Sequence, residues 1–283
     1  MNKLSKIIYS MSKVSPNLDP IVLLIDLDNT IIGNITPQIN EYYLIKDINK
    51  KLKKINKNQI RYNTKLLHEE LEKYIIRPKF SKFVRNINKY DNIELFIYTA
   101  SENSWANYII KQIEKVINYK FNRPIFTRNN LVINEKGKYK KSINVVKPLI
   151  IKALKKKKKY NLENIKYIAL IDNLRNVLIE KDKLIKCPEF NYRHQINYLR
   201  MIPEDILKKH YIIVEDRFNL KHSNNLYDFY EKYYQVLNSD YKLTKNNPNY
   251  LNDKYWFNFS IVLKQNLSNM SFTNLIKILR QIK

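Results

Sequence analysis

The chain contains very little cysteine or glycine. Its 283 residues include one cysteine, Cys187, and two glycines. A single cysteine excludes an internal disulfide and every cysteine-based zinc motif, and it favours a reducing compartment. No stretch approaches the roughly 18 uninterrupted apolar residues of a membrane-spanning helix, and residues 1–13 lack the apolar segment of a secretory signal. We therefore expect a soluble, intracellular protein of the nucleus or cytoplasm, with no membrane partner.

Acidic residues are also scarce. The 26 Asp and Glu face 52 Lys and Arg, which gives a formal net charge of +26. This excess predicts a polyanionic partner or substrate, with nucleic acid among the candidates. Coding bias toward A and T, as in a large DNA virus or an AT-rich parasite, would equally enrich Lys, Asn, Ile and Tyr and deplete Gly. Both explanations stay open.

A run of five aliphatic residues, 21–25, is followed at once by two aspartates, Asp26 and Asp28. The run has no polar alternation, which predicts a strand buried on both faces, as in a parallel sheet covered by helices. Open α/β sheets bind their ligands at the carboxyl ends of strands, where both aspartates lie. Two carboxylates this close need a cation or hydrogen-bond donors to compensate their burial, and a divalent metal is the expected partner.

Two further apolar runs end in polar residues suited to the same kind of site. Residues 93–98 lead into Thr99, and residues 165–171 lead into Asp172. A helix predicted to start after Thr99, capped by Ser101 or Ser104, would direct its backbone N–H groups toward this edge. The three strands together predict one phosphate and one metal at a shared edge.

Four short motifs occur in a recognisable order. They are DLDNT at 26–30, YTAS at 98–101, KKS at 140–142 and IDN at 171–173. In this order they resemble the motifs of the haloacid dehalogenase (HAD) superfamily of phosphotransferases. Arg77-Pro78 before a Phe-rich segment, and Trp105-Ala106 after YTAS, are similar to phosphatases of the RNA polymerase II C-terminal-domain type, the NLI-interacting-factor-like group. The resemblance covers roughly residues 20–200.

The resemblance implies an α/β fold, a HAD-like Rossmannoid three-layer sandwich with a central parallel sheet. Residues 99–141 leave room only for a small insert, so an open site is expected, which favours a macromolecular substrate. We place the phosphatase domain at 20–202, after a lead-in at 1–19. Residues 203–283, rich in Tyr, Asn and Lys, are expected to form an accessory region.

The resemblance also implies catalytic roles. Asp26 would be the nucleophile that forms an aspartyl-phosphate, and Asp28 would act as general acid and then as general base. Thr99, Ala100 and Lys141 would bind the phosphoryl oxygens. A carboxylate nucleophile splits a difficult hydrolysis into two easier displacements. Phosphoryl transfer then depends on positioning and on cations around the equatorial oxygens.

The implied cofactor is Mg²⁺, held by Asp26, the backbone carbonyl of Asp28, and Asp172, because this ion prefers hard oxygen ligands. The position of the phosphate-neutralising lysine is open, since Lys140 or Lys147 could serve in place of Lys141.

Three functions are consistent with these residues. The leading one is a Mg²⁺-dependent phosphatase acting on phosphoserine and phosphothreonine in proteins, such as the C-terminal repeats of an RNA polymerase. The net charge favours a second, a phosphatase of nucleic-acid ends. The third is a non-catalytic binding module on the same fold, against which the complete set Asp26, Asp28, Thr99 and Asp172 argues.

Several other elements are predicted from pattern alone. Thr64 is expected to cap a helix, residues 124–133 to form a hairpin turning at Asn129-Asn130, and Pro148 to open a helix that ends in the lysine run 155–159. Tyr211–Val214 suggests an edge strand, whereas residues 225–238 and 269–282 suggest helices.

Overall fold

The computed structural model describes residues 19–157, 160, 162–244, 250–266 and 271–282. The predicted lead-in at 1–19 therefore lies outside the described residues apart from Asp19. The same holds for the last two lysines of the run 155–159, and for the first two residues of the helix expected at 269–282.

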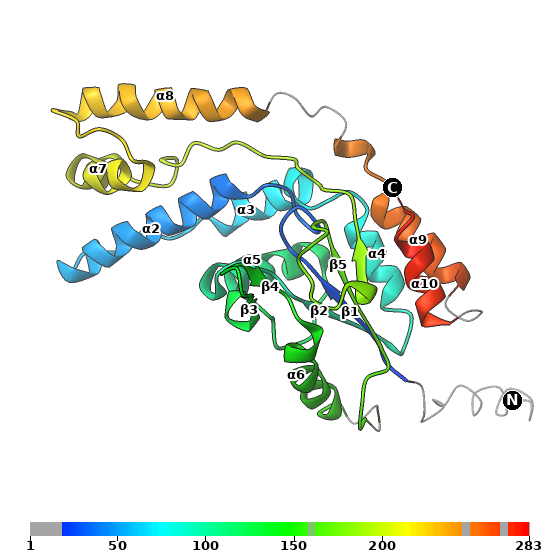
Figure 1. The fold of residues 1–283 in the computed structure, drawn as a ribbon. Coiled ribbons are helices and arrows are strands. Elements are labelled where there is room, and N and C mark those ends of the chain that lie inside the picture. Colours follow the sequence, from blue (N-terminus) through cyan, green and yellow to red (C-terminus); the bar gives the residue numbers. More distant parts are fainter. Residues whose placement is uncertain (1–18, 158–159, 161, 245–249, 267–270, 283) are drawn as a thin grey trace, which may run out of the picture.

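A parallel four-stranded sheet forms the centre of the fold (Figure 1). Its strands are β1 (Ile21–Ile25), β2 (Ile93–Ile97), β5 (Tyr167–Asp172) and β6 (Leu184–Lys186), in the order β2-β1-β5-β6. Every residue of β1 and β2 is buried, as their apolar runs predict, and this includes Glu94, the one charged residue of β2. Because β1 has β2 on one side and β5 on the other, the carboxyl ends of these three strands form a topological switch point, where such sheets bind ligands.

Helices cover both faces of this sheet. One face packs against α3 (Thr64–Glu70), α4 (Phe80–Ile87) and α5 (Asn103–Ile117), and the other packs against α6 (Ile143–Lys155). The predicted α/β fold with a central parallel sheet and helices on each side is confirmed. Within the described residues, no helix is both long and apolar enough to cross a bilayer.

The expected small insert between β2 and α6 contains the two-stranded hairpin β3 (Val132–Ile133) and β4 (Tyr139–Lys140). In the part of the chain that the structure describes, four further short helices connect larger elements: η1 (Leu71–Ile75), η2 (Arg128–Asn130), η3 (Lys181–Lys183) and η4 (Tyr250–Asn252).

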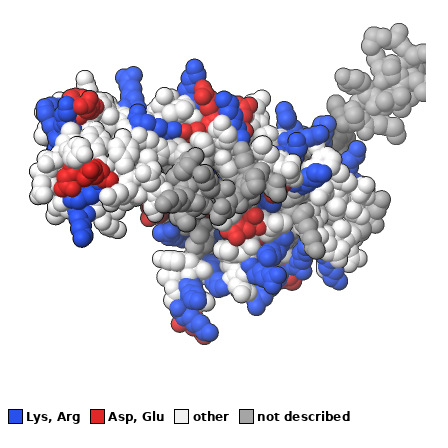
Figure 2. All heavy atoms as spheres, turned by 90° about the horizontal axis from the view of Figure 1, so that it is seen from above, with Lys and Arg blue, Asp and Glu red and all other residues white. Residues whose placement is uncertain are grey.

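A second helical layer extends away from the sheet (Figure 1). It consists of α2 (Thr36–Lys54), α7 (Glu204–Phe218) and α8 (Leu226–Thr244), which share a separate apolar cluster. Leu44 and Ile48 of α2 are buried there together with Val214 and Phe229. Figure 2 shows that blue basic side chains cover more of the upper face than red acidic ones.

The last two helices join the main core. Trp256 of α9 (Tyr255–Asn266) is fully buried, with its ring 4.5 Å from that of Phe83, and α10 (Phe272–Leu279) packs beside α9 and β6. Arg77 is buried and forms an ion pair of 2.7 Å with Asp253, the residue two positions before α9. The division of the chain at residue 203 stays a prediction, and α9 shares its apolar cluster with the sheet.

The predicted edge strand at Tyr211–Val214 is wrong, because these residues lie within α7. Their β-branched, aromatic composition favours a strand, but Leu207 and Val214 are both buried at a spacing of two helical turns and pack toward α2. Tertiary packing has overridden local propensity. The helix α9 was not among the predicted elements.

Three predicted boundaries are also wrong. The hairpin turns at 134–138 rather than at Asn129-Asn130, with Gly137 at φ +70°, a value that glycine adopts without strain. Helix α3 is capped by Asn63, whose side chain accepts the Leu66 N–H at 3.1 Å, instead of by Thr64. Helix α6 begins at Ile143 and contains Pro148 in its interior.

Candidate active site

The loop after β1 places Asp26 and Asp28 at the switch point. Asp26 is 6% exposed, and its backbone N–H donates to the Ile171 carbonyl at 2.9 Å, which ties the end of β1 to β5. The chain then turns sharply through Asn29, whose φ of +57° is a left-handed conformation that Asn tolerates better than most residues. Thr30 is fully buried, with its hydroxyl 3.4 Å from Asp26 Oδ2.

Lys141 joins two carboxylates that are far apart in the sequence. Its Nζ donates to Asp26 Oδ1 at 2.5 Å and to Asp172 Oδ2 at 2.6 Å, and all three side chains are buried. Lys140 instead donates to the Asn176 carbonyl, and Lys147 lies half-buried on α6. Of the three candidate lysines, the structure therefore brings Lys141 to the carboxylates.

Lys141 is held on both sides by backbone pairing. Its N–H donates to the Val177 carbonyl at 2.8 Å, and its own carbonyl accepts from the Ile179 N–H at 3.0 Å. Glu180, the residue after Ile179, caps the start of α6. Its carboxylate accepts the Ile143 and Asn144 N–H groups, each at 3.0 Å. The hydrogen bonds of 177–180 thus fix the lysine at the end of the insert.

The segment after β2 contacts Asp28. The Ser101 hydroxyl donates to Asp28 Oδ2 at 2.7 Å, and the Thr99 hydroxyl lies 3.4 Å from the same oxygen. Thr99 is buried, whereas Ala100 is exposed and its carbonyl accepts Arg128 Nε at 3.0 Å. The helix that follows begins at Asn103 without a side-chain cap, so the expected capping by Ser101 or Ser104 is wrong, and Ser101 contacts Asp28 instead.

Burial sets the electrostatics of the site. It raises the pKa of Asp26 to about 8, although Lys141 acts in the opposite direction. Burial also raises the pKa of Asp28, against the hydrogen bond from Ser101 and the charge of Lys141. Burial disfavours the charged form of Lys141, but the two carboxylates outweigh it and raise the pKa of the lysine. The lysine is therefore charged, and the site holds more carboxylates than cations.

The donor atoms suit a hard cation. Within the described residues, no group of three or more His, Cys, Asp or Glu side chains is arranged to hold a metal ion by itself. The expected set requires only two carboxylates, Asp26 and Asp172, because Asp28 contributes its backbone carbonyl. Burial favours the neutral forms of Asp26 and Asp28, and Mg²⁺ bound to Asp26 and Asp172 would favour the ionised carboxylate of Asp26 while keeping several waters.

Two contacts were not anticipated from the sequence. Ser101 belongs to the YTAS motif, but its bond to Asp28 depends on the path of the chain between β2 and α5. Arg128 is about half exposed and bonds to the Ala100 carbonyl, which places a cation beside the segment expected to bind phosphate. Arg128 lies within the predicted hairpin 124–133, and nothing in the sequence around it indicated this contact.

Comparison with known families agrees with this geometry. The family model described as "NLI interacting factor-like phosphatase" matches residues 21–217, and the chain belongs to this family of phosphatases. No curated protein matches the sequence significantly.

Two solved structures align along most of this chain. One is that of Fcp1, an essential RNA polymerase II CTD phosphatase, at 14% identity and a TM-score of 0.38, covering 97% of this chain and 73% of that one. The other is a variant of the fission yeast RNA polymerase II CTD phosphatase Fcp1 bound to beryllium fluoride, at 16% identity and a TM-score of 0.39, covering 98% and 73%. These values are too low to indicate what this chain acts on.

Proposed function

We propose that this phosphatase hydrolyses phosphoserine and phosphothreonine in proteins through an aspartyl-phosphate on Asp26. The observation that carries the proposal is the contact of one buried ammonium group, Lys141, with the carboxylates that follow β1 and end β5. Those carboxylates are distant in the sequence and have no structural need to be paired so close to an acidic neighbour. Binding of a phosphoryl group and its cation would explain why these ionisable groups are buried together.

In the first step, an Asp26 oxygen attacks phosphorus and the bond from phosphorus to the serine or threonine oxygen breaks. Asp28 gives its proton to the leaving alkoxide. The raised pKa of Asp28 suits a group that must be protonated when substrate arrives. Ser101 and Thr99 hold the Asp28 carboxyl from the side of α5.

In the second step, water attacks phosphorus, Asp28 accepts a proton from that water, and the bond between phosphorus and the Asp26 oxygen breaks to release phosphate. Lys141 stays charged throughout and compensates charge on Asp26 and on the phosphoryl oxygens. Because Asp26 forms a covalent bond, it must be ionised before the first step.

Mg²⁺, bound by Asp26, the Asp28 carbonyl and Asp172, would supply the additional positive charge that keeps the buried Asp26 ionised. Lys141 alone leaves the pKa of Asp26 at about 8. A thermal-shift titration tests the ion without requiring turnover. Millimolar Mg²⁺ should raise the melting temperature of the wild-type protein, and it should raise that of Asp172→Asn much less. An equal rise in both would show that Asp172 is not a ligand of the ion.

A protein substrate is supported by the small size of the insert between β2 and α6, in which the strands β3 and β4 are two residues each. The second candidate, hydrolysis of phosphate at nucleic-acid ends, is favoured by the net charge of +26. The two are separated by assaying purified protein with Mg²⁺ on phosphoserine and phosphothreonine peptides and on 5′- and 3′-phosphorylated oligonucleotides. Release of phosphate from the peptides alone is expected.

Asp26→Asn is the control in the same assay, since it removes the nucleophile while keeping the side-chain shape. Its activity should fall at least about 1,000-fold, and beryllofluoride with Mg²⁺ should inhibit wild-type protein as an aspartyl-phosphate mimic. Normal turnover by Asp26→Asn, or turnover of oligonucleotides only, would contradict the proposal.

A further inference from the structure

The lysines of α2 and the turn after it form a charged surface that the phosphatase chemistry does not use. Six of them lie within a short stretch, and all are exposed: Lys46, Lys50, Lys51, Lys53, Lys54 and Lys57. Within the described part of the chain, no carboxylate pairs with any of the six. The nearest acid on the helix, Asp47, is bound by Arg217 of α7 at 2.7 Å. We call these six residues the α2 basic surface.

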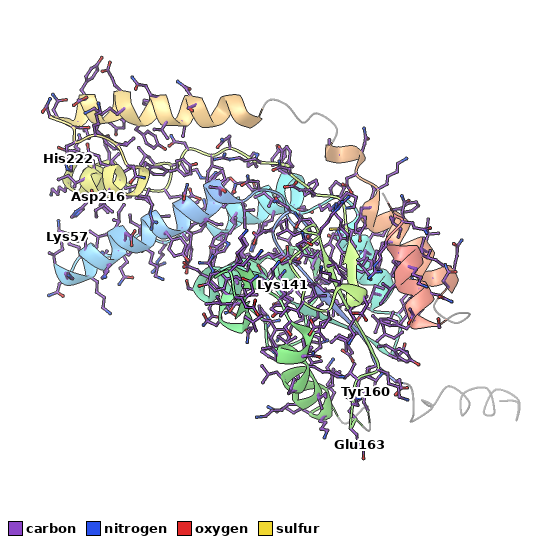
Figure 3. All side chains as sticks on the ribbon, in the orientation of Figure 1. Lys57, Lys141, Tyr160, Glu163, Asp216 and His222 are labelled. Atoms are coloured by element: carbon purple, nitrogen blue, oxygen red, sulfur yellow. The ribbon has the colours of Figure 1, made fainter. Side chains whose placement is uncertain are left out.

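The α2 basic surface is long. Lys46 to Lys54 span about 12 Å along the helix axis at the usual rise per residue. Figure 3 shows that the surface continues to Lys57, at the far end of α2 from Lys141. A single phosphate cannot contact all six ammonium groups, whereas a chain of phosphates can.

Two cavities flank α2. One, of about 570 Å³, is lined by Lys46, Lys50 and Lys53, by Tyr42 and Tyr62, and by Asp47, the acid that pairs with Arg217. Its far wall is fixed because Asn49 exchanges two hydrogen bonds with the Ile60 backbone, at 2.7 and 3.0 Å. This volume lies in the range of small-ligand pockets, so a single planar group can enter.

The other cavity, of about 440 Å³, lies between α2 and α7. It is lined by Lys50, Lys51 and Lys54, with Asp216 and the paired Asp47 as its acids. Lys50 borders both cavities. The basic groups therefore run continuously from one side of α2 to the other.

The surface begins near the candidate active site. Lys46 Nζ lies 5.7 Å from the centre of the Tyr43 ring, and the Tyr43 hydroxyl donates to Glu102 Oε2 at 2.6 Å. Glu102 directly follows Ser101, which bonds to Asp28. A polymer lying along α2 would therefore pass close to the phosphate-binding segment without using its residues.

From these observations we propose that the α2 basic surface binds single-stranded nucleic acid, with its phosphates on the lysines and a base in the tyrosine-lined cavity. Lysines alone would suit any polyanion, but aromatic rings beside them suit unpaired bases, whose stacking is independent of sequence. A duplex keeps its bases stacked and has no planar group to insert. A multiply phosphorylated peptide offers a planar ring only where it carries an aromatic side chain, whereas every nucleotide of a single strand carries a base.

The test is fluorescence anisotropy of a labelled 20-nucleotide oligothymidylate with the full chain. One variant carries Lys50→Ala, Lys53→Ala and Lys57→Ala. The matched control carries Lys152→Ala, Lys155→Ala and Lys156→Ala, which remove the same charge from exposed positions at the C-terminal end of α6. The α2 variant should bind at least 10-fold more weakly, and its dependence of log K on log salt should be shallower by about 2, since three phosphate contacts are lost. The α6 variant should bind within 2-fold of wild type.

Equal weakening by both triple variants would show that bulk charge suffices and would overturn the proposal. So would tighter binding of a duplex, or of a phosphopeptide with the same number of charges. An abasic oligonucleotide of equal length should bind at least 5-fold more weakly than the thymidylate. Equal affinity would show that the cavity does not bind a base. Hydrolysis of a small phosphate ester by the α2 variant should be unchanged, so failure of this proposal is distinguishable from failure of the proposed function.

Discussion

The Ser101 hydroxyl donates to Asp28 Oδ2 at 2.7 Å, and this bond connects the segment after β2 to the loop after β1. Thr99 contacts the same oxygen from 3.4 Å. The two hydroxyls therefore fix the rotamer of a carboxyl group that must face first a leaving oxygen and then a water molecule. Ser101 acts as a positioning residue, because its contact is with Asp28.

Replacing Ser101 by Ala should lower kcat about 10-fold and leave KM within about 2-fold, since one hydrogen bond to an ionisable group is lost and no substrate contact is removed. Ser101→Thr keeps the hydroxyl and should restore most of kcat. Steady-state kinetics on a small phosphate ester provide the measurement. Ser104→Ala, at an exposed position on α5, is the control. A rise in KM with unchanged kcat would show that Ser101 binds substrate instead.

Lys141→Met should reduce activity at least about 1,000-fold and destabilise the protein by about 3–5 kcal/mol, because two buried carboxylates lose their shared partner. Lys140→Met and Lys147→Met should remain within about 2-fold of wild type. Lys141→Arg keeps the charge and controls for loss of folding, which circular dichroism monitors. If Lys147→Met were inactive and Lys141→Met active, the assignment of the phosphate-neutralising lysine would be wrong.

Much of this site was predictable because its parts are local in sequence. Asp26 and Asp172 each follow an apolar run, and parallel strands bring such ends together. Lys141 was not separable from Lys140 and Lys147 on the sequence, since that choice depends on the pairing of its backbone with Val177 and Ile179. Backbone hydrogen bonds between residues far apart in the chain produce no periodic pattern in the sequence from which they could be predicted.

The start of α6 illustrates the same limit. Pro148 suggested a helix N-terminus, because proline lacks the N–H that a helix interior uses. The helix instead begins at Ile143, where Glu180, far along the chain, accepts the first N–H groups. A cap supplied by a distant residue cannot be read from neighbouring positions.

The indole of Trp256 provides a test of the C-terminal region. It is fully buried, and its Nε1–H lies 3.4 Å from the Thr30 carbonyl in the loop of the candidate nucleophile. Trp256→Ala should lower the free energy of unfolding by about 3–5 kcal/mol, as measured by urea denaturation. Tyr227→Ala, at a side chain that is 73% exposed, should change it by less than about 0.5 kcal/mol.

The same packing predicts the outcome of shortening the chain. A protein ending at residue 217, where the family match ends, would expose Phe80 and Phe83 of α4, which α9 covers. We expect it to aggregate or to lose its cooperative unfolding transition. A stable, active product would instead show that residues after 217 form a separate accessory region.

Glu180 should make stability depend on pH. Burial disfavours its ionised form, but the N–H groups of Asn144 and Ile143 and the Ser142 hydroxyl outweigh burial and lower its pKa in the folded protein. The unfolded chain therefore binds a proton first as the pH falls. The stabilisation is complete well above the unfolded pKa of about 4.3, and it is lost as the pH drops through the folded value.

Urea denaturation across the acid range, from neutral pH to below that unfolded pKa, should therefore show a shallower loss of stability for Glu180→Gln than for wild type. The difference arises because glutamine keeps a hydrogen-bond acceptor at the start of α6 but cannot titrate. Glu69→Gln, at an exposed position on α3, should keep the wild-type slope. Parallel curves for Glu180→Gln and wild type would mean that the cap of α6 carries no titrating charge.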